Sequence, residues 1–399
     1  MLINVERLQR KMDEAGLDGI VATTLGNVFY LTGVLSDGLQ LFPYEHQSYA
    51  VITRDCPTEA YLIASLGFAN QAWMGYDSLK GVVTFGKFSR PGPFTDTLLT
   101  EKEEWLRVIA QDVEPEATPV DALVVALKKM GLEDKRIGLD ELNLKPGVQE
   151  TLTGKLPQAQ LTHVSKLMRW VRKVKTPPEI ERLKHVTKMA ENAIVATLGI
   201  ARADVTEYEM AREFDRSIVS QGGKPEFTLI RIGRNGIAGE VDPGRTPLKR
   251  GDTIWFDVGC SYEGYYADIA RIGALGEPSP RARSIYRAVL AGEQAAIDRA
   301  RAGMTGGELF DLTMAATRAA GLPHYERHHV GHGIGTELYE DVLISPGVQD
   351  VLEEGTVVNT ETPYYEFGLG ALHVEDPFIL KAAGNELLTS LGRELLIVE

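Results

Sequence analysis

Apolar residues in the first half of the chain alternate between a helical spacing and the short runs that are typical of buried strands. One face of an N-terminal helix carries four of them, Val5, Leu8, Met12 and Ala15. Gly16 ends this helix, and the apolar run 19–22 follows as a strand. Further strands are expected at 48–53, 60–63 and 81–85, and further helices at 101–110 and 120–130. This alternation predicts an α/β domain, which we place at residues 1–165.

A change of pattern after this domain marks the start of a second one. Residues 166–177 contain a basic run, KLMRWVRKVK, which we interpret as a solvated connector because its charges are few and the chain is acidic overall. Thr176, Pro177 and Glu179 then form the N-cap, the first-turn proline and the capping-box glutamate of a new helix. Residues 178–399 are therefore expected to form the second domain.

Composition and charge narrow the range of partners. Hydrophobic residues make up 44% and charged residues 25% of the 399 residues, which is ordinary globular usage. The formal net charge of −14 disfavours nucleic acid and anionic lipid as partners. The two cysteines, Cys56 and Cys260, fit no metal or disulfide spacing, so we expect two reduced thiols in a cytoplasmic protein.

Neither export nor membrane insertion is expected. The N-terminal segment has charges every few residues and lacks the apolar region of a signal peptide. The longest uncharged stretch, 19–36, is about long enough to span a bilayer, but it contains the turn-forming pair Gly26 and Asn27. We interpret this stretch as two buried strands joined by a turn.

Two aspartates stand inside apolar strands, where an unpaired carboxylate is costly. Asp257 lies in the run 253–259, and Asp268 lies in the run 265–272, which follows a turn at 261–264. A hairpin folded symmetrically about this turn pairs Asp257 directly with Asp268. Opposed carboxylates on neighbouring strands have Cβ atoms about 5 Å apart and repel each other, so we expect a cation between them.

A second carboxylate pair and one histidine extend this pattern. Glu361 and Glu375 flank a loop centred on Gly368, so the same hairpin geometry makes them cross-strand partners. His332 stands in the glycine-rich turn 331–335, which can hold an imidazole rigidly. Four carboxylates and one histidine suit two divalent ions about 3.5–4 Å apart. This oxygen-rich set favours manganese, iron, cobalt or zinc over copper, and we expect manganese.

These residues carry a resemblance to a known family. The motifs FDVG…ADIAR, HHVGHGIG and NTETPYY…HVED are similar to the five-ligand pattern of the pita-bread metallopeptidases, which include Xaa-Pro dipeptidases (prolidases), aminopeptidase P and methionine aminopeptidase. The segment ERLQRKMDEAGLDGIVATTLGNVFYLTG resembles the creatinase/prolidase accessory domain, which methionine aminopeptidases lack. The resemblance covers nearly the whole chain. It implies an α/β creatinase/prolidase-type N-terminal domain and an α+β pita-bread catalytic domain.

The resemblance also implies a role for each of the five ligands. Asp257 and Asp268 would bind one ion, His332 and Glu361 would complete the other, and Glu375 would bridge the two. A water or hydroxide between the ions would be the nucleophile, and Glu361 would shuttle its proton. The same resemblance implies a homodimer.

Several positions depart from the family pattern around this site. His328 keeps the place of a substrate-contacting histidine, but Tyr339 and Glu240 each replace another family histidine. His373 replaces a family arginine, and Ala270 replaces a threonine. The metal ligands are thus kept while the substrate pocket is altered.

The altered residues suggest roles of their own. Tyr339 either donates a hydrogen bond to the oxyanion, since a phenol is a good neutral donor, or serves packing alone. Glu240 at the edge of the substrate pocket would favour a cationic group. His373 is counted with the substrate-binding residues but is expected mainly to support the metal ligands, and His329 is expected to be structural or solvent-facing.

The sequence leaves three functions open. The first is a metal-dependent hydrolase that resembles Xaa-Pro dipeptidase or aminopeptidase P and cleaves a short peptide. The alternative is a hydrolase or lyase of the same fold that acts on a non-peptide small molecule, as creatinase-like and sulfonium-lyase-like relatives do, and the altered pocket motivates it. A non-catalytic binding protein is disfavoured because all five ligands are present.

Overall fold

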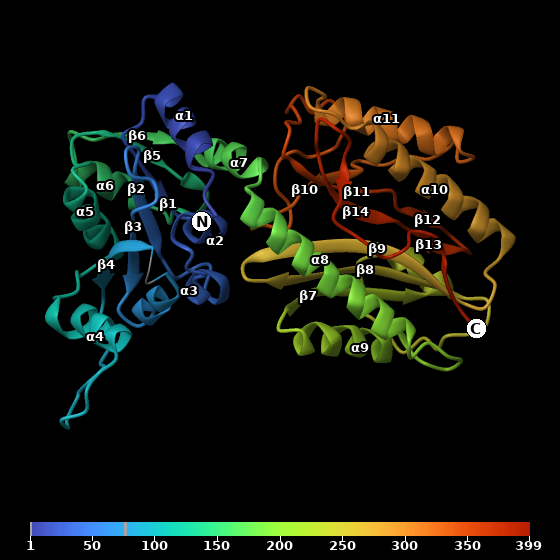
Figure 1. The fold of residues 1–399 in the computed structure, drawn as a ribbon, viewed down its shortest axis with the longest axis horizontal. Helices are drawn as coiled ribbons and strands as arrows, with labels where there is room; N and C mark the ends of the chain where they lie inside the picture. The colour runs from blue at the N-terminus through green and yellow to red at the C-terminus, as the bar shows by residue number, and fades with distance from the viewer. Residues whose placement is uncertain (1, 76–77) are drawn as a thin grey trace. The chain divides into compact units, whose positions relative to one another are not determined.

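The computed structural model describes residues 2–75 and 78–399, and the chain divides into two compact units, Met1–Arg172 and Lys173–Glu399 (Figure 1). The division falls inside the expected connector. Most of that segment is helix α7 (Ser165–Lys173), whose Met168 and Val171 are buried in the core of the first unit. The expectation of a solvated connector is therefore wrong, because the apolar face of this helix packs on the first unit. Within the described ranges, no helix combines the length and the apolar character that a membrane span requires.

A mixed sheet with the strand order β4-β3-β2-β1-β5-β6 forms the middle of the first unit. Its strands are β1 (Gly19–Ala22), β2 (Tyr49–Thr53), β3 (Ala60–Ser65), β4 (Leu79–Phe85), β5 (Arg136–Leu139) and β6 (Gln160–His163). Successive residues of β1 point to opposite faces, so that Ile20 and Ala22 pack in one core cluster and Val21 packs in the other. The sheet is therefore buried on both faces, as an α/β domain requires.

Helices cover each face of this sheet (Figure 1). One core cluster includes residues of α1 (Val5–Ala15), α2 (Leu25–Thr32), α3 (Asp37–Leu41) and α7, with Trp105 of α4 (Glu101–Arg107) packed against it. The other includes residues of α5 (Pro119–Lys129) and α6 (Val148–Lys155). The predicted alternation of strands and helices is confirmed for most of this unit.

The uncharged stretch at 19–36 is one exception, because only β1 is a strand and α2 follows it. Thr24 caps α2, and its side chain accepts a hydrogen bond from the backbone N–H of Asn27. The buried Asp140 also accepts hydrogen bonds from the N–H of Thr24 at 3.0 Å and from Nδ2 of Asn27 at 2.9 Å. The expected second strand is therefore wrong, since a distant carboxylate helps to fix the start of a helix there.

A larger, mostly antiparallel sheet forms the second unit, with the strand order β10-β11-β14-β9-β8-β7. These strands are β7 (Lys224–Ile232), β8 (Thr253–Tyr262), β9 (Tyr265–Leu275), β10 (Gly331–Gly333), β11 (Val357–Glu361) and β14 (Glu375–Ile379). The short strands β15 (Glu386–Leu387) and β16 (Leu396–Val398) pair with β14 and β9, and β12 (Tyr364–Glu366) forms a hairpin with β13 (Gly370–Leu372).

Three of the described helices pack on this sheet, and a fourth packs on one of them (Figure 1). Helix α8 (Pro177–Leu198) packs on β8 and β9, and α9 (Glu207–Ser220) packs on β7. Helix α10 (Pro280–Arg299) packs on β11, β13 and α11 (Gly306–Ala319). Helix α8 begins at the predicted capping box of Thr176 and Glu179.

The two predicted carboxylate hairpins have different outcomes. Glu361 lies directly opposite Glu375 across β11 and β14, as predicted. Asp257 does not lie opposite Asp268, because its partner on β9 is Ala270, and Asp268 faces Gly259. The β8–β9 register therefore differs by two residues from the prediction.

The β8–β9 turn explains this difference. It consists of two residues, Glu263 and Gly264, with φ of 46° and 80°, between the paired Tyr262 and Tyr265. Two-residue hairpins with positive φ at both positions match the right-handed twist of the strands. Side chains alternate with a period of two, so a shift by two residues keeps both aspartates on the same face of the sheet.

Replacing Gly264 tests this turn. We expect Gly264→Ala to lower the free energy of unfolding by about 1–2 kcal/mol, because a side chain disfavours the left-handed conformation. Gly264→Asn should retain most of the stability, since asparagine tolerates positive φ. Urea unfolding of the three proteins measures the effect, and an alanine variant as stable as the wild type would contradict the proposed role of the turn.

Candidate metal centre

One row of side chains crosses four neighbouring strands of the second unit. Ala270 of β9 lies opposite Asp257 of β8 on one side and opposite Glu375 of β14 on the other. Glu375 in turn lies opposite Glu361 of β11. Asp268 is two residues from Ala270 on β9 and so shares its face. The register thus gathers four carboxylates on one face of the sheet. Between Asp257 and Glu375 in this row lies only the methyl group of Ala270.

His332 completes this cluster from β10. Its side chain is fully buried, and its Nδ1 lies 2.8 Å from the carbonyl oxygen of Gly333. Because a carbonyl can only accept, Nδ1 carries the proton, and in the neutral ring Nε2 keeps a free lone pair. Nε2 lies 3.6 Å from Asp268 Oδ2 and 3.8 Å from Glu375 Oε1, and it has no hydrogen-bond partner among the described residues. This is the arrangement of a metal ligand.

The glycines beside His332 bring backbone close to it. Gly331 has φ of 144°, and a Cβ atom there would lie 2.3 Å from the carbonyl oxygen of Asn359 on the adjacent β11. A side chain at this position would push β10 away from β11 and move His332 out of the cluster. The glycine-rich turn is therefore a steric requirement of the site.

The carboxylates of the cluster are electrostatically strained. Burial and the neighbouring Asp268 and Glu361 raise the pKa of Asp257 well above its usual range. Burial raises the pKa of Asp268, and burial together with Asp268 raises that of Glu375. For Glu361, burial acts upward, but the hydrogen bond from His329 and nearby imidazoles lower the pKa to about 2. Negative charge is therefore in excess at the cluster, although Arg327 lies 4.0 Å from Glu361.

Two divalent cations fit this donor set. Ligand atoms of Asp268, His332 and Glu375 lie within 4.8 Å of one another, and the same holds for Asp257, His373 and Glu375. Glu375 thus lies close to Asp257 and also to the Asp268–His332 pair, as a bridging carboxylate would. Asp268 Oδ1 and His332 Nε2 are both buried and lack hydrogen-bond partners among the described residues. Oxygen donors with a histidine nitrogen suit manganese, iron, cobalt or zinc.

His373 lies beside this cluster and is fully enclosed. Trp255 Nε1 donates a hydrogen bond to His373 Nδ1 at 3.3 Å, and the two rings are stacked. Burial lowers the pKa of His373 to about 3, so the ring is neutral. An indole N–H can only donate, so the proton of His373 is on Nε2, which faces Glu375 Oε2 at 3.5 Å and Glu361 Oε2 at 3.7 Å. His373 therefore presents an N–H rather than a free lone pair toward the carboxylates, and at these distances its Nε2 has no hydrogen-bond partner among the described residues.

A cavity of about 630 Å³ opens onto the cluster. Four of the predicted metal ligands line it, together with Glu240, His328 and Tyr339. His373, which was counted with the substrate-binding residues, is not among the described residues that line the cavity. The sequence missed Arg327, which lines the cavity next to His328.

Tyr339 combines packing with exposure to the cavity. Its ring is stacked on His332, with 3.6 Å between ring centroids and 15° between planes. Burial and the nearby carboxylates raise the pKa of its hydroxyl, which therefore stays protonated. The hydroxyl lies 3.4 Å from His329 Nε2. Tyr339 thus holds the imidazole of His332 in place and keeps a neutral donor beside the ligands.

His329 lies against Glu361, contrary to the expectation of a structural or solvent-facing residue. Its Nε2 is 2.7 Å from Glu361 Oε1, and 14% of its side chain is exposed. His328 packs edge-on against His329, with 4.2 Å between ring centroids, and lies at the exposed side of the cavity. Both histidines of the His328-His329 pair therefore reach the site, and the doublet itself was the available signal.

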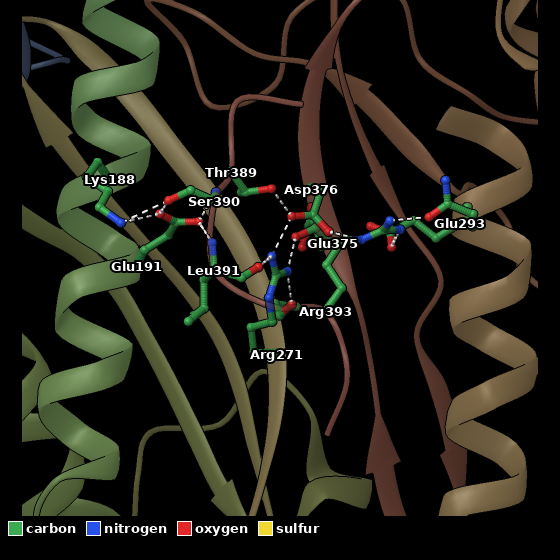
Figure 2. Close-up of polar contacts among 12 residues, drawn as sticks. Lys188, Glu191, Arg271, Glu293, Glu375, Asp376, Thr389, Ser390, Leu391 and Arg393 are labelled. Atoms are coloured by element: carbon green, nitrogen blue, oxygen red, sulfur yellow. Dashed lines mark hydrogen bonds and ion pairs between the residues drawn. The ribbon is translucent and has the colours of Figure 1, made fainter. Parts of the chain in front are cut away.

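A buried ionic network holds the strands behind the ligands (Figure 2). The Nη1 group of Arg271 donates to the backbone oxygens of Ala270 at 2.9 Å and Glu375 at 3.0 Å, and its Nη2 pairs with Asp376 at 2.5 Å. Arg393 Nε donates to the other oxygen of Asp376 at 3.0 Å. Because Arg271 joins β9 to β14 at the level of Ala270 and Glu375, it fixes the spacing of the carboxylate row.

Comparisons with known proteins agree with this architecture. Residues 181–382 match metallopeptidase family M24, and residues 4–78 match the creatinase/prolidase N-terminal domain. The chain is 26% identical to the uncharacterized peptidase YqhT of Bacillus subtilis over 99% of this chain and 100% of that one. It is 25% identical to an Xaa-Pro dipeptidase of Lactobacillus delbrueckii subsp. lactis over 99% of both chains. The solved structure of an Xaa-Pro dipeptidase from Bacillus anthracis superposes with a TM-score of 0.78 at 25% identity, covering 99% of each chain. The predicted fold class is confirmed.

The raised pKa values of the carboxylates predict how the stability of the metal-free protein depends on pH. A group whose pKa is raised on folding stabilises the fold below its unfolded pKa, about 4 for Asp and Glu, and this stabilisation is lost as the pH rises through the folded value. Asp257, Asp268 and Glu375 all have raised pKa values, whereas the lowered pKa of Glu361 matters only below this window. Metal-free protein should therefore lose stability from about pH 4 towards neutrality.

Manganese should reverse this loss, because deprotonated carboxylates bind the ion and binding stabilises the folded state. Thermal unfolding with Mn²⁺ and with a chelator measures the difference in Tm at each pH. This difference should widen as the pH rises and shrink in Asp257→Asn. A Tm difference that is constant across the pH range would contradict the prediction.

Proposed function

Since the chain belongs to metallopeptidase family M24, we propose that it is a dinuclear-metal enzyme of the Xaa-Pro dipeptidase and aminopeptidase P type, acting on short peptides. The chain is a metal-dependent peptidase by its relatives and its structural neighbours. The observation that supports the finer proposal is Glu375, whose carboxylate lies within 4.8 Å of a ligand atom of Asp257 and of the Asp268–His332 pair at the base of a cavity.

Each of the five ligand residues has a defined part in this proposal. The residues that would hold two divalent ions, with manganese as the expected metal, are Asp257, Asp268, His332, Glu361 and Glu375. When bound, such ions polarise the scissile carbonyl and lower the pKa of a water to near neutrality. Glu361 takes the proton of the attacking water and returns it to the leaving nitrogen. The hydrogen bond from His329 at 2.7 Å orients Glu361 for this transfer.

The surrounding residues orient the substrate and stabilise charge. Tyr339 is protonated and half-exposed to the cavity, so its hydroxyl can donate to the developing oxyanion. His328 at the exposed side contacts the substrate, and Glu240, which also lines the cavity, attracts its cationic amino group. His373 presents its Nε2–H toward Glu375 and Glu361 at 3.5 and 3.7 Å.

The proposal also covers the cellular compartment, the oligomeric state and the domain limits. Both cysteines are free, one exposed and one buried, which fits a reducing compartment such as the cytoplasm. The family resemblance implies a homodimer. The domain limits 1–165 and 178–399 are proposed as independent folding units, with α7 between them belonging to the first.

A second candidate is an enzyme of this family that acts on a non-peptide small molecule. Ala270, Tyr339 and His373 each replace a family residue next to the ligands. All three lie within the described cluster or against it. A changed set of neighbours can change the substrate while the metal ligands stay the same.

Hydrolysis of Xaa-Pro dipeptides and tripeptides by the manganese-reconstituted protein, compared with a chelated control, separates the two candidates. We expect metal-dependent release of proline from dipeptides or of the N-terminal residue from tripeptides. Asp257→Asn and Glu361→Gln should each lower kcat by at least about 10²-fold with the fold retained, because each removes a ligand or the proton carrier. If fully metal-loaded protein cleaves no peptide, the non-peptide candidate takes its place.

Tyr339→Phe tests the oxyanion role. The change should lower kcat by about 10²-fold with little change in KM, since it removes one donor that acts in the transition state. Steady-state kinetics on the best peptide of the panel measures both constants. Tyr262→Phe, at the β8–β9 turn, is the control for loss of a tyrosine hydroxyl elsewhere in the same unit. An unchanged kcat would contradict the oxyanion role and would mean that Tyr339 acts only by packing on His332.

A further inference from the structure

Arg327 is a charged residue of the cavity to which the resemblance gives no role. It lies directly before His328, and 16% of its side chain is exposed. The cavity lining that the structure describes contains six carboxylates and, apart from histidines, no basic side chain other than Arg327. A single guanidinium therefore faces a strongly acidic cavity.

The contacts of Arg327 leave its hydrogen-bonding capacity unused. Its Nη2 is 4.0 Å from Glu361 Oε2, which is longer than a hydrogen bond. Its guanidinium carbon lies 5.7 Å from the ring centroid of Tyr365. Its Nε is buried and has no hydrogen-bond partner among the described residues. Buried donors are nearly always paired, so an unpaired one that lines a cavity points to a ligand.

Metal binding would make an anionic ligand beside Arg327 still more favourable. Glu361 is the nearest carboxylate to Arg327, and its charge would be shared with a divalent ion in the loaded enzyme. A guanidinium that is largely removed from water and lacks a full counter-charge is unfavourable. Its planar fork of N–H groups matches the two oxygens of a carboxylate.

We propose that Arg327 binds a carboxylate of the substrate on the leaving-group side of the scissile bond. This inference rests on the proposed function. In an Xaa-Pro dipeptide the free carboxylate is attached to the carbon next to the leaving nitrogen. Glu361 delivers a proton to that nitrogen, and Arg327 lies beside Glu361, so the two residues are neighbours as the two groups of the substrate are. Arg327 thus selects dipeptides with a free carboxylate over longer or amidated peptides.

Binding of matched acids and amides to the full-length, manganese-reconstituted protein tests this role without turnover. The probes are N-acetyl-L-proline and its amide, and N-acetyl-L-alanine and its amide, measured by isothermal titration calorimetry. The wild type should bind at least one acid about tenfold or more tightly than its amide, as expected for a charge-assisted pair. Arg327→Gln should remove that preference by weakening the acid alone, and Arg327→Lys should retain part of it.

Controls separate the effect from metal binding and from misfolding. Arg216→Gln changes an exposed arginine that pairs with Glu213 on α9, outside the cavity, and should leave both affinities unchanged. Thermal unfolding and metal content are measured for each variant. An acid preference that persists in Arg327→Gln would mean that the metal ions bind the carboxylate, and it would overturn the inference.

Failure of the inference and failure of the proposed function give different results. If the wild type shows no preference for either acid, or binds neither, Arg327 is not a carboxylate site, whatever the hydrolysis panel shows. If the acid preference depends on Arg327 but no Xaa-Pro peptide is cleaved, the carboxylate site stands and the substrate is a different small acid. The alanine pair reports this case even if proline does not fit the cavity.

Discussion

Four carboxylates on one face of a sheet, with little water around them, form the constraint on which the second unit depends. Asp257, Glu375 and Glu361 occupy a single row across the strands, and Asp268 lies two residues away on β9. Taken alone, these groups repel one another, and burial adds to the cost of their charges. Divalent cations relieve both effects at once. The free energy of folding and the affinity for metal are therefore linked in this unit.

Because the carboxylates repel, the surrounding structure must hold them in place. The β8–β9 and β11–β14 ladders fix the row, and Arg271 ties β9 to β14 through backbone oxygens within that row. Asp376 and Arg393 in turn fix Arg271 (Figure 2). A buried ionic network of this kind contributes little net stability, but it allows few alternative arrangements. Its main effect here is on the positions of the ligands.

Much of the site could be predicted from sequence, since regular hairpins make cross-strand partners readable. The pairing of Glu361 with Glu375 follows from a loop centred on Gly368, and the structure has that register. The pairing of Asp257 with Asp268 could not be read in the same way, because the turn type depends on positive φ at Glu263 and Gly264. The error did not matter for the site, since a shift by two residues preserves the face.

Residues outside regular elements were the least predictable. Alternation along β10 would put His328, and not His329, on the side of His332, but the segment before β10 is irregular and His329 contacts Glu361. Arg327 escaped notice for the same reason, because its approach to the cavity depends on the path of this loop. Helix α2 was mistaken for a strand, since its N-terminus is fixed by the distant Asp140.

The departure from the family pattern at His373 changes the positive charge around the ligands. The arginine that the resemblance places behind Glu375 is a neutral histidine in this chain, held in one tautomer by Trp255. The ligands consequently have less protein-borne positive charge behind them and depend more on the bound cations. In front of the ligands, Arg327 presents a guanidinium to the cavity. The neutral residue behind Glu375 thus weakens the metal-free site, whereas the guanidinium in front of the ligands is placed where a substrate anion can use it.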